Sequence, residues 1–472
     1  MNIVQLLPEL VLSAMVLVLF GTSLTTTRTE SLNAIALVFS ALSLAAAILS
    51  FGQQGMLFYD TYRLDALSQL FKVIITFGLF LVIFAAPGLK GIDAKIRSEY
   101  YMFLAVGTLG LVCLVSSYEL LTILLSLEIS AFALNVIIPF RYLNSSRTQM
   151  EAAIKYFLFG VIGTGIMLYG MSYIFGLAKS TYLADLAKTI PALLQTEPLA
   201  VVGMIMLLCG FFFKLSLFPM HFMTPDVYEG SANETTSYIA TLPKVTAVAL
   251  LIRLVSLTGV EFSQLTWLLA IFAVLSMTVG NLSALAQNDL KRLLAYSSIA
   301  HAGYVTLGLL SVNELGFSSA IYYMAGYLLM NLACFFVIYQ LSANGENLTF
   351  DSLRGLYKRS PLLAFTLAAG AFGMTGIPPT VGFTGKFLIF TAAIQKGLYA
   401  LVIIAVINAA ISAFYYLKMV RAAYMTTDEP SDAVALSLPA AALGVFFIVA
   451  IIATGILPQS IIALARQAVA GM

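Results

Sequence analysis

The sequence predicts an all-α, polytopic membrane protein of about fourteen transmembrane helices, with two inverted five-helix repeats that each contain a broken helix. Of the 472 residues, 61% are hydrophobic and only 10% are charged, whereas soluble domains carry about 25% charged residues. Apolar runs long enough to cross a bilayer recur along the whole chain. Two of these runs, in corresponding places, are interrupted by proline close to a lysine.

The transmembrane segments follow from their length and apolar composition. A helix needs about 20 predominantly apolar residues to cross the hydrocarbon core, and we count fourteen such segments. One boundary depends on the short turn SSYE at 116–119, and one segment is broken around 376–385. The segments cover residues 3–22, 31–52, 64–86, 99–116, 118–138, 151–177, 198–219, 235–257, 265–287, 294–311, 317–341, 361–378 continuing with a break to 396, 398–421 and 435–457.

The basic residues orient these helices. Of the 24 lysines and arginines, fourteen lie in the odd-numbered connections, six in the even-numbered connections and the C-terminus, and four inside spans. Because cytoplasmic loops are enriched in Lys and Arg, we expect the odd connections in the cytoplasm. Both termini are then expected on the outer, periplasmic side of a bacterial-type inner membrane. No basic residue precedes the first apolar stretch, so we expect no cleaved signal peptide.

Composition also argues against several kinds of site. The net charge of +2 and the lack of a basic cluster argue against a nucleic-acid partner. Cys113, Cys209 and Cys334 stand singly in apolar runs, so we expect no iron–sulfur or structural zinc site in this chain. His221 and His301 are too far apart in sequence to indicate a metal site. No glycine-rich nucleotide-binding motif is present.

Four lysines fall inside predicted spans. An ionisable group in a span costs about 2.5–3.5 kcal/mol on insertion scales and therefore marks a functional position. Lys72 lies near the start of its span, and we expect its long side chain to snorkel to the interface. Lys214, Lys244 and Lys386 lie deeper in their spans.

The acidic residues are equally informative. Glu128 lies in the middle of its span and is expected to be a buried carboxylate. Glu119, nine residues earlier, points to a different side of that helix and is either an interfacial charge or the entry to a relay. Glu9 is expected at the membrane interface. Asp226 and Glu229 follow the first broken helix and are expected to be solvated.

A carboxylate and an amine in a dry interior can exchange charge. A buried lysine alone tends to lose its proton, and a nearby carboxylate restores the charge. Glu128 with Lys214 would then act as a switch that releases a proton when the carboxylate moves away. The alternative is a fixed ion pair that joins two helices. Because buried pairs stabilise poorly compared with apolar replacements, we favour the switch.

The helices divide into two blocks of five. Because five is an odd number, the second block is inverted in the membrane relative to the first. The expected units are 1–98 with three N-terminal helices, 99–257 and 258–421 with one repeat each, and 422–472 with the C-terminal helix.

The fourth helix of each block is broken by proline. The segment FKLSLFPMHF contains Lys214 and Pro219, and GIPPTVGFTGKF contains Pro378, Pro379 and Lys386. Paired broken helices in inverted halves point to the transport site of a secondary-transporter fold. Broken backbone at that depth needs protein or water as a partner, so we expect these lysines in half-hydrated cavities.

Each half also contains a histidine. His221 follows the first break, and a side chain that titrates near neutral pH suits a proton relay. It could equally be an interfacial residue that bonds to the freed backbone. His301, in the second helix of its block as Glu128 is in the first, is expected to be a relay residue.

Three of these stretches carry a family resemblance. FKLSLFPMHFMTPDVYEG, NDLKRLLAYSSIAHAGY and GIPPTVGFTGKF resemble the antiporter-like membrane subunits of proton-pumping NADH–quinone oxidoreductase, respiratory complex I. The resemblance covers about residues 100–420 and is strongest to the subunit N branch. The length leaves no room for the long lateral helix of the subunit L branch. Lys386 stands where the subunit M branch is expected to have glutamate.

The resemblance implies roles for particular residues. Glu128, Lys214, Lys244 and Lys386 match the family's charged chain along the middle of the membrane, and His301 matches the histidine between the halves. The chain would translocate protons without a redox centre of its own. NADH, FMN, iron–sulfur clusters and quinone would belong to other subunits. Its partners would be antiporter-like and small membrane subunits, together with lipid.

The chain departs from the family pattern at one place. After PDVYEG many relatives carry a run like APTPV, whereas this chain has SANETTSY, which includes Glu234. An alternative function is a subunit of the related multi-subunit cation/proton antiporters, because these share the motifs and carbonyl groups at a helix break could bind a cation. A purely structural subunit is a third alternative, and two intact broken helices with lysines argue against it.

Overall fold

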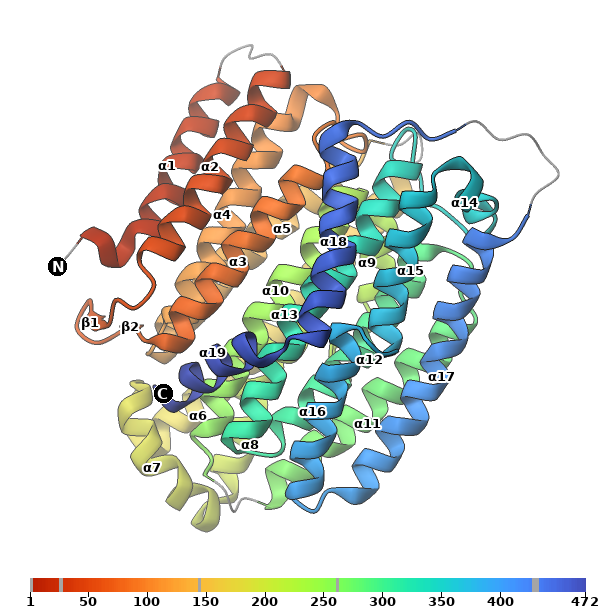
Figure 1. The fold of residues 1–472 in the computed structure, drawn as a ribbon. Coiled ribbons are helices and arrows are strands. Elements are labelled where there is room, and N and C mark those ends of the chain that lie inside the picture. The colour runs from red at the N-terminus through yellow and green to blue at the C-terminus, as the bar shows by residue number, and fades with distance from the viewer. Residues whose placement is uncertain (1–2, 25–28, 143–145, 260–262, 427–432) are drawn as a thin grey trace.

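The computed structural model describes residues 3–24, 29–142, 146–259, 263–426 and 433–472, and within them the chain is almost entirely helical. Figure 1 shows a bundle in which α1–α5 lie together on one side and α11 and α15–α17 on the other. An all-α, polytopic fold is therefore confirmed. Arg28, one of the fourteen basic residues in odd connections, lies outside the described residues.

The longer helices follow the expected segments closely. They are α1 (Leu7–Ser23), α2 (Thr29–Leu49), α3 (Ala66–Ala85), α4 (Arg97–Ser116), α5 (Leu120–Ile137), α6 (Ser146–Ala178), α8 (Pro198–Leu215), α10 (Asn233–Ser256), α11 (Ser263–Leu285), α12 (Leu290–Leu309), α13 (Glu314–Leu341), α17 (Tyr399–Tyr424) and α18 (Leu438–Ile456). The shorter ones are α7 (Leu183–Thr196), α9 (Thr224–Gly230), α14 (Leu356–Arg359), α15 (Pro361–Thr375), α16 (Val381–Gln395) and α19 (Gln459–Ala470).

Twelve helices of the described residues are long and apolar enough to cross a membrane. Two of the fourteen expected segments differ from this group. One is α12, which is less apolar because it carries Lys291, Arg292 and His301. The other is the 361–396 segment, which divides into the two shorter helices α15 and α16.

Both helix breaks occur where the sequence predicts them. Helix α8 ends at Leu215, followed by Ser216 in the left-handed conformation (φ 62°), and the chain becomes helical again only at α9. Helix α15 ends at Thr375, followed by left-handed Gly376 (φ 90°), before α16 begins. A left-handed residue terminates a helix, and the prolines after it lack the N–H that would continue the ladder. The peptide bonds before Pro219 and Pro379 are cis.

Helices α10 and α13 form the centre of the bundle. They pack against each other, and α10 also contacts α3, α4, α8 and α12. Both are almost completely buried along their length, although α10 carries several polar and charged side chains. In Figure 1 they run between the two groups of helices. Polar side chains on these helices therefore face protein instead of lipid.

The short helices α7 and α19 were among those not expected from the sequence. Helix α7 buries Leu183, Leu186, Ile190 and Leu194, which lie on one face, and leaves its other face exposed. Helix α19 packs across α13 and α3 near the C-terminus, so the 422–472 segment contains a second helix after its transmembrane helix. A two-stranded hairpin, β1 (Gly55–Leu57) and β2 (Tyr62–Leu64), joins α2 to α3. These elements are too short or too polar to resemble spans.

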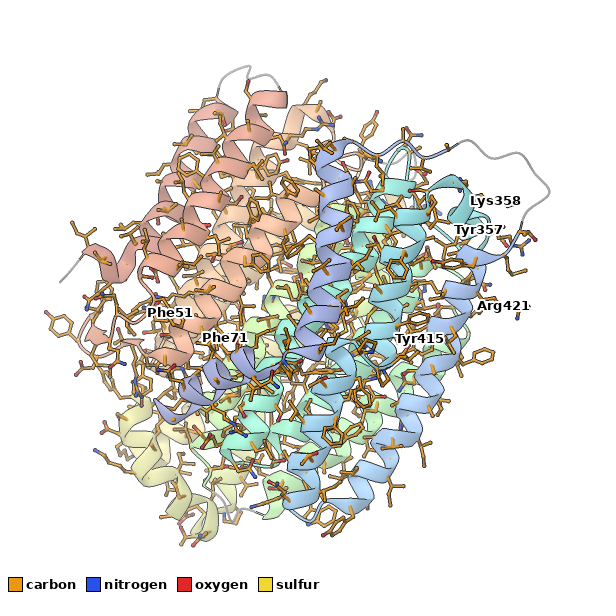
Figure 2. The ribbon with its side chains drawn as sticks, viewed as in Figure 1. Phe51, Phe71, Tyr357, Lys358, Tyr415 and Arg421 are labelled. Atoms are coloured by element: carbon orange, nitrogen blue, oxygen red, sulfur yellow. The ribbon has the colours of Figure 1, made fainter. Side chains whose placement is uncertain are left out.

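The basic connections at one end of the molecule can be followed in Figure 2. Tyr357, Lys358 and Arg421 lie together at the end where α14 begins and α17 finishes. Tyr415, nearer the middle of α17, is almost completely buried in the bundle. The expectation that this basic end faces the cytoplasm stays a prediction.

Candidate functional site

Lys214 lies in the last turn of α8, directly before the first break, and only 6% of its surface is exposed. Its Nζ donates to the hydroxyl of Tyr156 on α6, at 3.4 Å. A cavity of about 10 Å³ adjoins the ammonium and is also lined by Ser216, Thr224 and Pro243. This volume is about the size needed for one water molecule. The break therefore provides a small space beside the lysine, in which the hydroxyls of Ser216 and Thr224 lie among mostly apolar side chains.

Glu128 lies on α5 and accepts a hydrogen bond from Thr164 Oγ1 of α6, at 2.6 Å. It is half-buried within this chain, which is less burial than the sequence analysis expects for it. The physical reason is its helix face, because the neighbouring Leu125 and Ile129 are exposed on the outside of the bundle. Within the described residues, Glu128 and Lys214 bond to these separate partners and form no ion pair with each other.

Lys244 binds the end of the first broken helix. It projects from the central helix α10, and 2% of its surface is exposed. Its Nζ donates to the carbonyl of Leu215 at 2.9 Å and to Ser216 Oγ at 2.7 Å. The last carbonyls of a helix have no partner within the helix, and they carry partial negative charge that attracts a cation. Lys244 therefore satisfies groups that the break leaves free.

Lys386 bonds to the carbonyls at the end of the helix before the second break. It lies in α16, after the break, with 5% of its surface exposed. Its Nζ donates to the carbonyls of Met374 and Thr375, both at 2.9 Å. The ammonium also lies over the ring of Tyr304, 4.8 Å from the centroid. Each break thus presents its terminal carbonyls to one buried lysine.

His301 lies on α12 between the two lysine sites, and 3% of its surface is exposed. Its Nδ1 is 2.5 Å from the hydroxyl of Tyr323 on α13, and its Nε2 is 3.0 Å from the hydroxyl of Tyr416 on α17. The hydroxyl of Tyr416 also contacts Ser297 Oγ. Both imidazole nitrogens therefore have hydroxyl partners, which can donate or accept as the tautomer requires.

The structure adds polar residues that the sequence analysis did not single out. Asn281 of α11 donates to the side-chain oxygen of Asn408 at 3.1 Å and to the Tyr304 hydroxyl at 3.2 Å. It accepts from the hydroxyl of Tyr415 at 2.9 Å. Asn408 stands in an otherwise apolar run, and Tyr415 is followed by Tyr416. These residues were visible as polar interruptions, but only packing brings them together.

His221 lies in the break itself and is buried. Its ring stacks on Phe218, with centroids 5.4 Å apart, and lies 4.3 Å from the ring of Phe222.

Glu119 is the N-cap of α5, where its carboxylate accepts from the backbone N–H of Thr122 at 2.8 Å. Burial by itself would raise the pKa of Glu119. Hydrogen bonds from Thr181 and from the first turn of α5 outweigh this effect and hold the pKa below its ordinary value.

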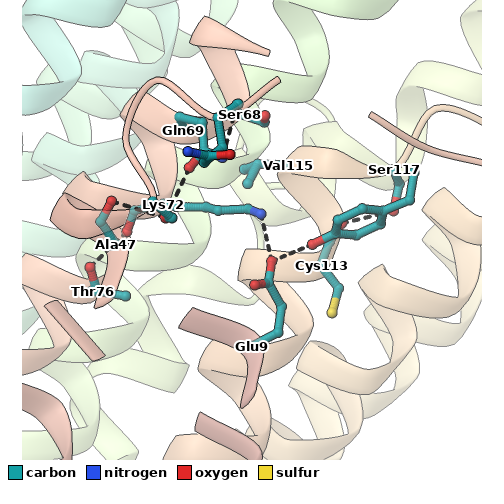
Figure 3. A network of polar contacts seen from close by, with 12 residues as sticks. Glu9, Ala47, Ser68, Gln69, Lys72, Thr76, Cys113, Val115 and Ser117 are labelled. Carbon is teal, nitrogen blue, oxygen red and sulfur yellow. Dashed lines mark hydrogen bonds and ion pairs between the residues drawn. The ribbon is translucent and has the colours of Figure 1, made fainter. Parts of the chain in front are cut away.

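Lys72 does not snorkel to the interface, and the expectation for it was wrong, because its side chain pairs with Glu9 in the first turn of α1. Their side chains form an ion pair at 2.5 Å, in which the lysine is completely buried. Figure 3 shows Lys72 extending from α3 towards Glu9, beside Cys113. The hydroxyl of Tyr62 donates to the same carboxylate oxygen. Helices α2, α4 and α10 pack against α3, and Lys72 reaches from it to the carboxylate of Glu9 on α1.

Asp226 and Glu229 are likewise not simply solvated. The guanidinium of Arg292 contacts Asp226 at 2.8 Å and Glu229 at 2.5 Å, and Lys155 contacts Asp226 at 2.5 Å. Burial would raise the pKa of Asp226, but Lys155 and Arg292 hold it below its ordinary value. The ion pairs join α9 to α6 and α12. The short helix after the first break is thus fixed to its neighbours.

Comparison with known proteins identifies the family. The family model described as "NADH:quinone oxidoreductase/Mrp antiporter, TM" matches residues 117–412. The chain belongs to this family. It is 45% identical to NADH-quinone oxidoreductase subunit N 2 of Opitutus terrae, over 97% of this chain and 96% of the relative. It is also 45% identical to the protein of the same name from Solidesulfovibrio magneticus, over 99% of both chains.

Solved structures of the NADH:quinone oxidoreductase/Mrp antiporter family share the fold. A chain of respiratory complex I from Thermus thermophilus with bound aureothin superposes with a TM-score of 0.84 at 32% identity, over 97% of this chain and 99% of that one. A chain of the Mrp complex from Dietzia sp. DQ12-45-1b gives a TM-score of 0.88 at 18% identity, over 100% and 97%. At that lower identity the likeness shows the fold alone. The resemblance inferred from the three sequence motifs is confirmed.

Proposed function

We propose that this chain is a proton-translocating membrane subunit of a redox-driven NADH–quinone oxidoreductase. The observation that carries this proposal is the pair of buried lysines, Lys244 and Lys386, each bonded to the carbonyls at one helix break. Placing a cation at that depth is costly, so its presence marks a functional position. The names of the relatives that match nearly the whole chain support the same complex.

The proposed path runs along the middle of the bundle. It begins at Glu128, passes Lys214 and Lys244, reaches His301 and ends at Lys386. Ser216 connects the first two lysines, because its hydroxyl bonds to Lys244 and lines the cavity beside Lys214. A carbonyl group accepts a hydrogen bond but cannot take the proton. Each lysine is therefore held in place at a break while its own proton can be transferred.

A change of charge outside the chain would drive the path. Glu128 is half-buried, on an outer helix face with exposed apolar neighbours, so a group on an adjacent subunit can act on it directly. If its carboxylate moves towards Lys214, the charged lysine is favoured, and if it moves away, the proton is released. Lys244 and His301 would pass the change in charge to Lys386. His221 is a possible relay residue at the first break, and Glu119 remains an N-cap in this scheme.

The chain would contribute no redox chemistry. NADH, FMN, iron–sulfur clusters and quinone would be bound by other subunits, and this chain would bind other antiporter-like and small membrane subunits and lipid. We place it in a bacterial inner membrane with both termini outside. The division into units at 98/99, 257/258 and 421/422 belongs to the same proposal.

A cation/proton antiporter subunit is the second candidate, because the Mrp chain shares the fold. The lysine contacts favour protons instead. The carbonyls of Leu215, Met374 and Thr375 are the kind of ligands that a sodium ion would need at the breaks, and they accept hydrogen bonds from Lys244 and Lys386. A sodium ion would have to displace an ammonium group from each place.

The test is proton pumping per quinone reduced, measured in membrane vesicles for Lys214→Ala and Lys386→Ala. Native gels verify assembly, and Lys188→Ala, an exposed lysine on α7, is the matched control. We expect both buried-lysine variants to assemble and to lose pumping and coupled electron transfer, while the control keeps both. Pumping at the wild-type level in both variants would overturn the proposal.

A further inference from the structure

Glu234 is a buried carboxylate that the proposed path does not include. It lies in the first turn of α10, within the segment where the chain departs from the family pattern, and 2% of its surface is exposed. Its Oε1 accepts from the backbone N–H of Gly91 at 3.1 Å. Its Oε2 is buried and has no hydrogen-bond partner among the described residues. A buried acceptor without a partner is costly.

The surroundings of Glu234 are cationic, but the cations are bonded elsewhere. Lys291 and Lys90 are close enough for their charges to act on the carboxylate. Lys291 donates to the carbonyl of Ser231 at 2.7 Å, and Lys90 donates to the carbonyl of Ser342 at 2.8 Å. Within the described residues, Glu234 forms no ion pair. Its Oε2 atom therefore has no hydrogen-bond partner among the described residues, although the positive charges of Lys291 and Lys90 lie nearby.

Glu234 also lies just beneath the surface. Gly91 belongs to the α3–α4 connection, and the side chain of Lys90, next to it, is half-buried. Asn233, directly before Glu234, donates to the carbonyl of Glu346 in the α13–α14 connection at 3.4 Å. Both connections are among the basic ones expected on the cytoplasmic side. The carboxylate thus lies next to two connections of that side, and Tyr142 of the α5–α6 connection also donates its backbone N–H to the carbonyl of Gly91.

A line of polar side chains leads from Glu234 to the proposed path. Glu234, Ser237, Thr241 and Lys244 stand at positions i, i+3, i+7 and i+10 of α10, which places them along one helix face. All four are buried. Ten residues of helix cover about 15 Å, and the hydroxyls of Ser237 and Thr241 lie between the two ends. In this structure they donate to carbonyls of their own helix, Ser237 Oγ to Glu234 and Thr241 Oγ1 to Ser237, both at 2.7 Å, so each hydroxyl would have to rotate to pass a proton. After Lys244, apolar residues occupy most positions of α10.

We propose that Glu234 is the proton donor that loads Lys244 from the basic side of the molecule. A hydronium ion at the α3–α4 connection gives a proton to Oε2, so that one of its O–H bonds breaks, water is left, and a new O–H bond makes the carboxyl group neutral. That proton then moves along Ser237 and Thr241 to the neutral amine of Lys244, which forms an N–H bond and restores the carboxylate. This inference rests on the proposed function, since it supplies the proton that the path moves.

A structural role is the competing explanation, because the Gly91 bond ties the α3–α4 connection to α10. Two substitutions separate the roles. Glu234→Gln keeps the shape and an acceptor for Gly91 but cannot carry the proton. Glu234→Asp shortens the side chain and strains that bond but keeps a titratable carboxyl group. A proton donor predicts that Asp works better than Gln, and an anchor predicts the reverse.

The experiment measures proton uptake and quinone reduction in vesicles that contain the assembled complex. Glu346→Gln is the control, because Glu346 is on the same side and its carboxylate accepts from the backbone N–H groups of Ala343 and Asn344 in its own turn. We expect Glu234→Gln to assemble and to lower proton uptake at least about tenfold, as removal of a proton-transfer group does. Glu234→Asp should retain most of the uptake, and Glu346→Gln should match the wild type.

Two results would overturn the inference. One is wild-type uptake in Glu234→Gln, and the other is loss of assembly in Glu234→Asp with normal activity in Glu234→Gln. Lys386→Ala, measured in the same vesicles, separates this inference from the proposed function. If Lys386→Ala fails to pump while Glu234→Gln pumps normally, the path stands and protons enter it elsewhere. If both pump normally, the path and its donor are both wrong.

Discussion

The ammonium of Lys72 and the carboxylate of Glu9 form an ion pair 2.5 Å long between α3 and α1, in which the lysine is completely buried and 11% of the glutamate side chain is exposed. Loss of one partner leaves the other as a buried, unpaired charge, which costs about 3–5 kcal/mol. We therefore expect Lys72→Met to lower the thermal stability of the assembled complex markedly. Thermal unfolding of the solubilised complex, followed for this chain, measures the effect.

The double variant tests whether the pair or the apolar packing matters. Glu9→Gln combined with Lys72→Met removes both charges, while the glutamine still accepts from the Tyr62 hydroxyl. A buried pair can be replaced by uncharged side chains at little cost, so the double variant should regain most of the lost stability. If the double variant is no more stable than Lys72→Met alone, the ion pair is not the reason for the loss.

The ion pairs of Asp226 predict a dependence of stability on pH. Because Lys155 and Arg292 hold its folded-state pKa below the ordinary value, the carboxylate contributes stability above about pH 4, the unfolded-state pKa. That contribution is lost as the pH falls further, through the lower folded-state pKa. Wild type should therefore exceed Asp226→Asn in melting temperature at neutral pH, and the difference should shrink in acid. A difference that grows in acid would contradict this sign.

Gly170 is a close-contact position between α6 and α8. A Cβ added there would lie 2.3 Å from the backbone nitrogen of Leu207 and 2.6 Å from the carbonyl oxygen of Gly203. Backbone atoms cannot yield as a side chain can, so Gly170→Ala should force the two helices apart. Overpacking of this kind costs about 1–3 kcal/mol. The same shift should weaken proton pumping, because Lys214 on α8 bonds to Tyr156 on α6.

Gly165 provides the matched control on the same helix. A Cβ at Gly165 would meet no atom within 4 Å, and alanine favours a helix over glycine by about 1 kcal/mol. Gly165→Ala should therefore leave assembly and pumping unchanged or slightly improve stability. Native gels and melting curves of the two variants give the comparison. Equal behaviour of Gly165→Ala and Gly170→Ala would show that the α6–α8 contact is not tight.

The candidate site was only partly predictable from the sequence. Lys214, Lys244, Lys386 and His301 stand out because each is a polar residue in a long apolar run, and the structure finds all four buried. Their partners did not stand out. Tyr323 and Tyr416 look like ordinary aromatic residues of their helices, and only the packing of α12 against α13 and α17 brings them to His301.

The sequence by itself determined most of the membrane helices, the two proline breaks and the family. These features depend on residues that are neighbours along the chain: the length of an apolar run, the position of a proline and the short motifs around it. The tertiary structure decided which charges meet. It buried Lys72 against Glu9, left Glu128 on an outer face, and brought Lys244 to the carbonyl of Leu215. Such contacts join residues on different helices, and the depth of a residue along its own helix does not fix the side to which it points.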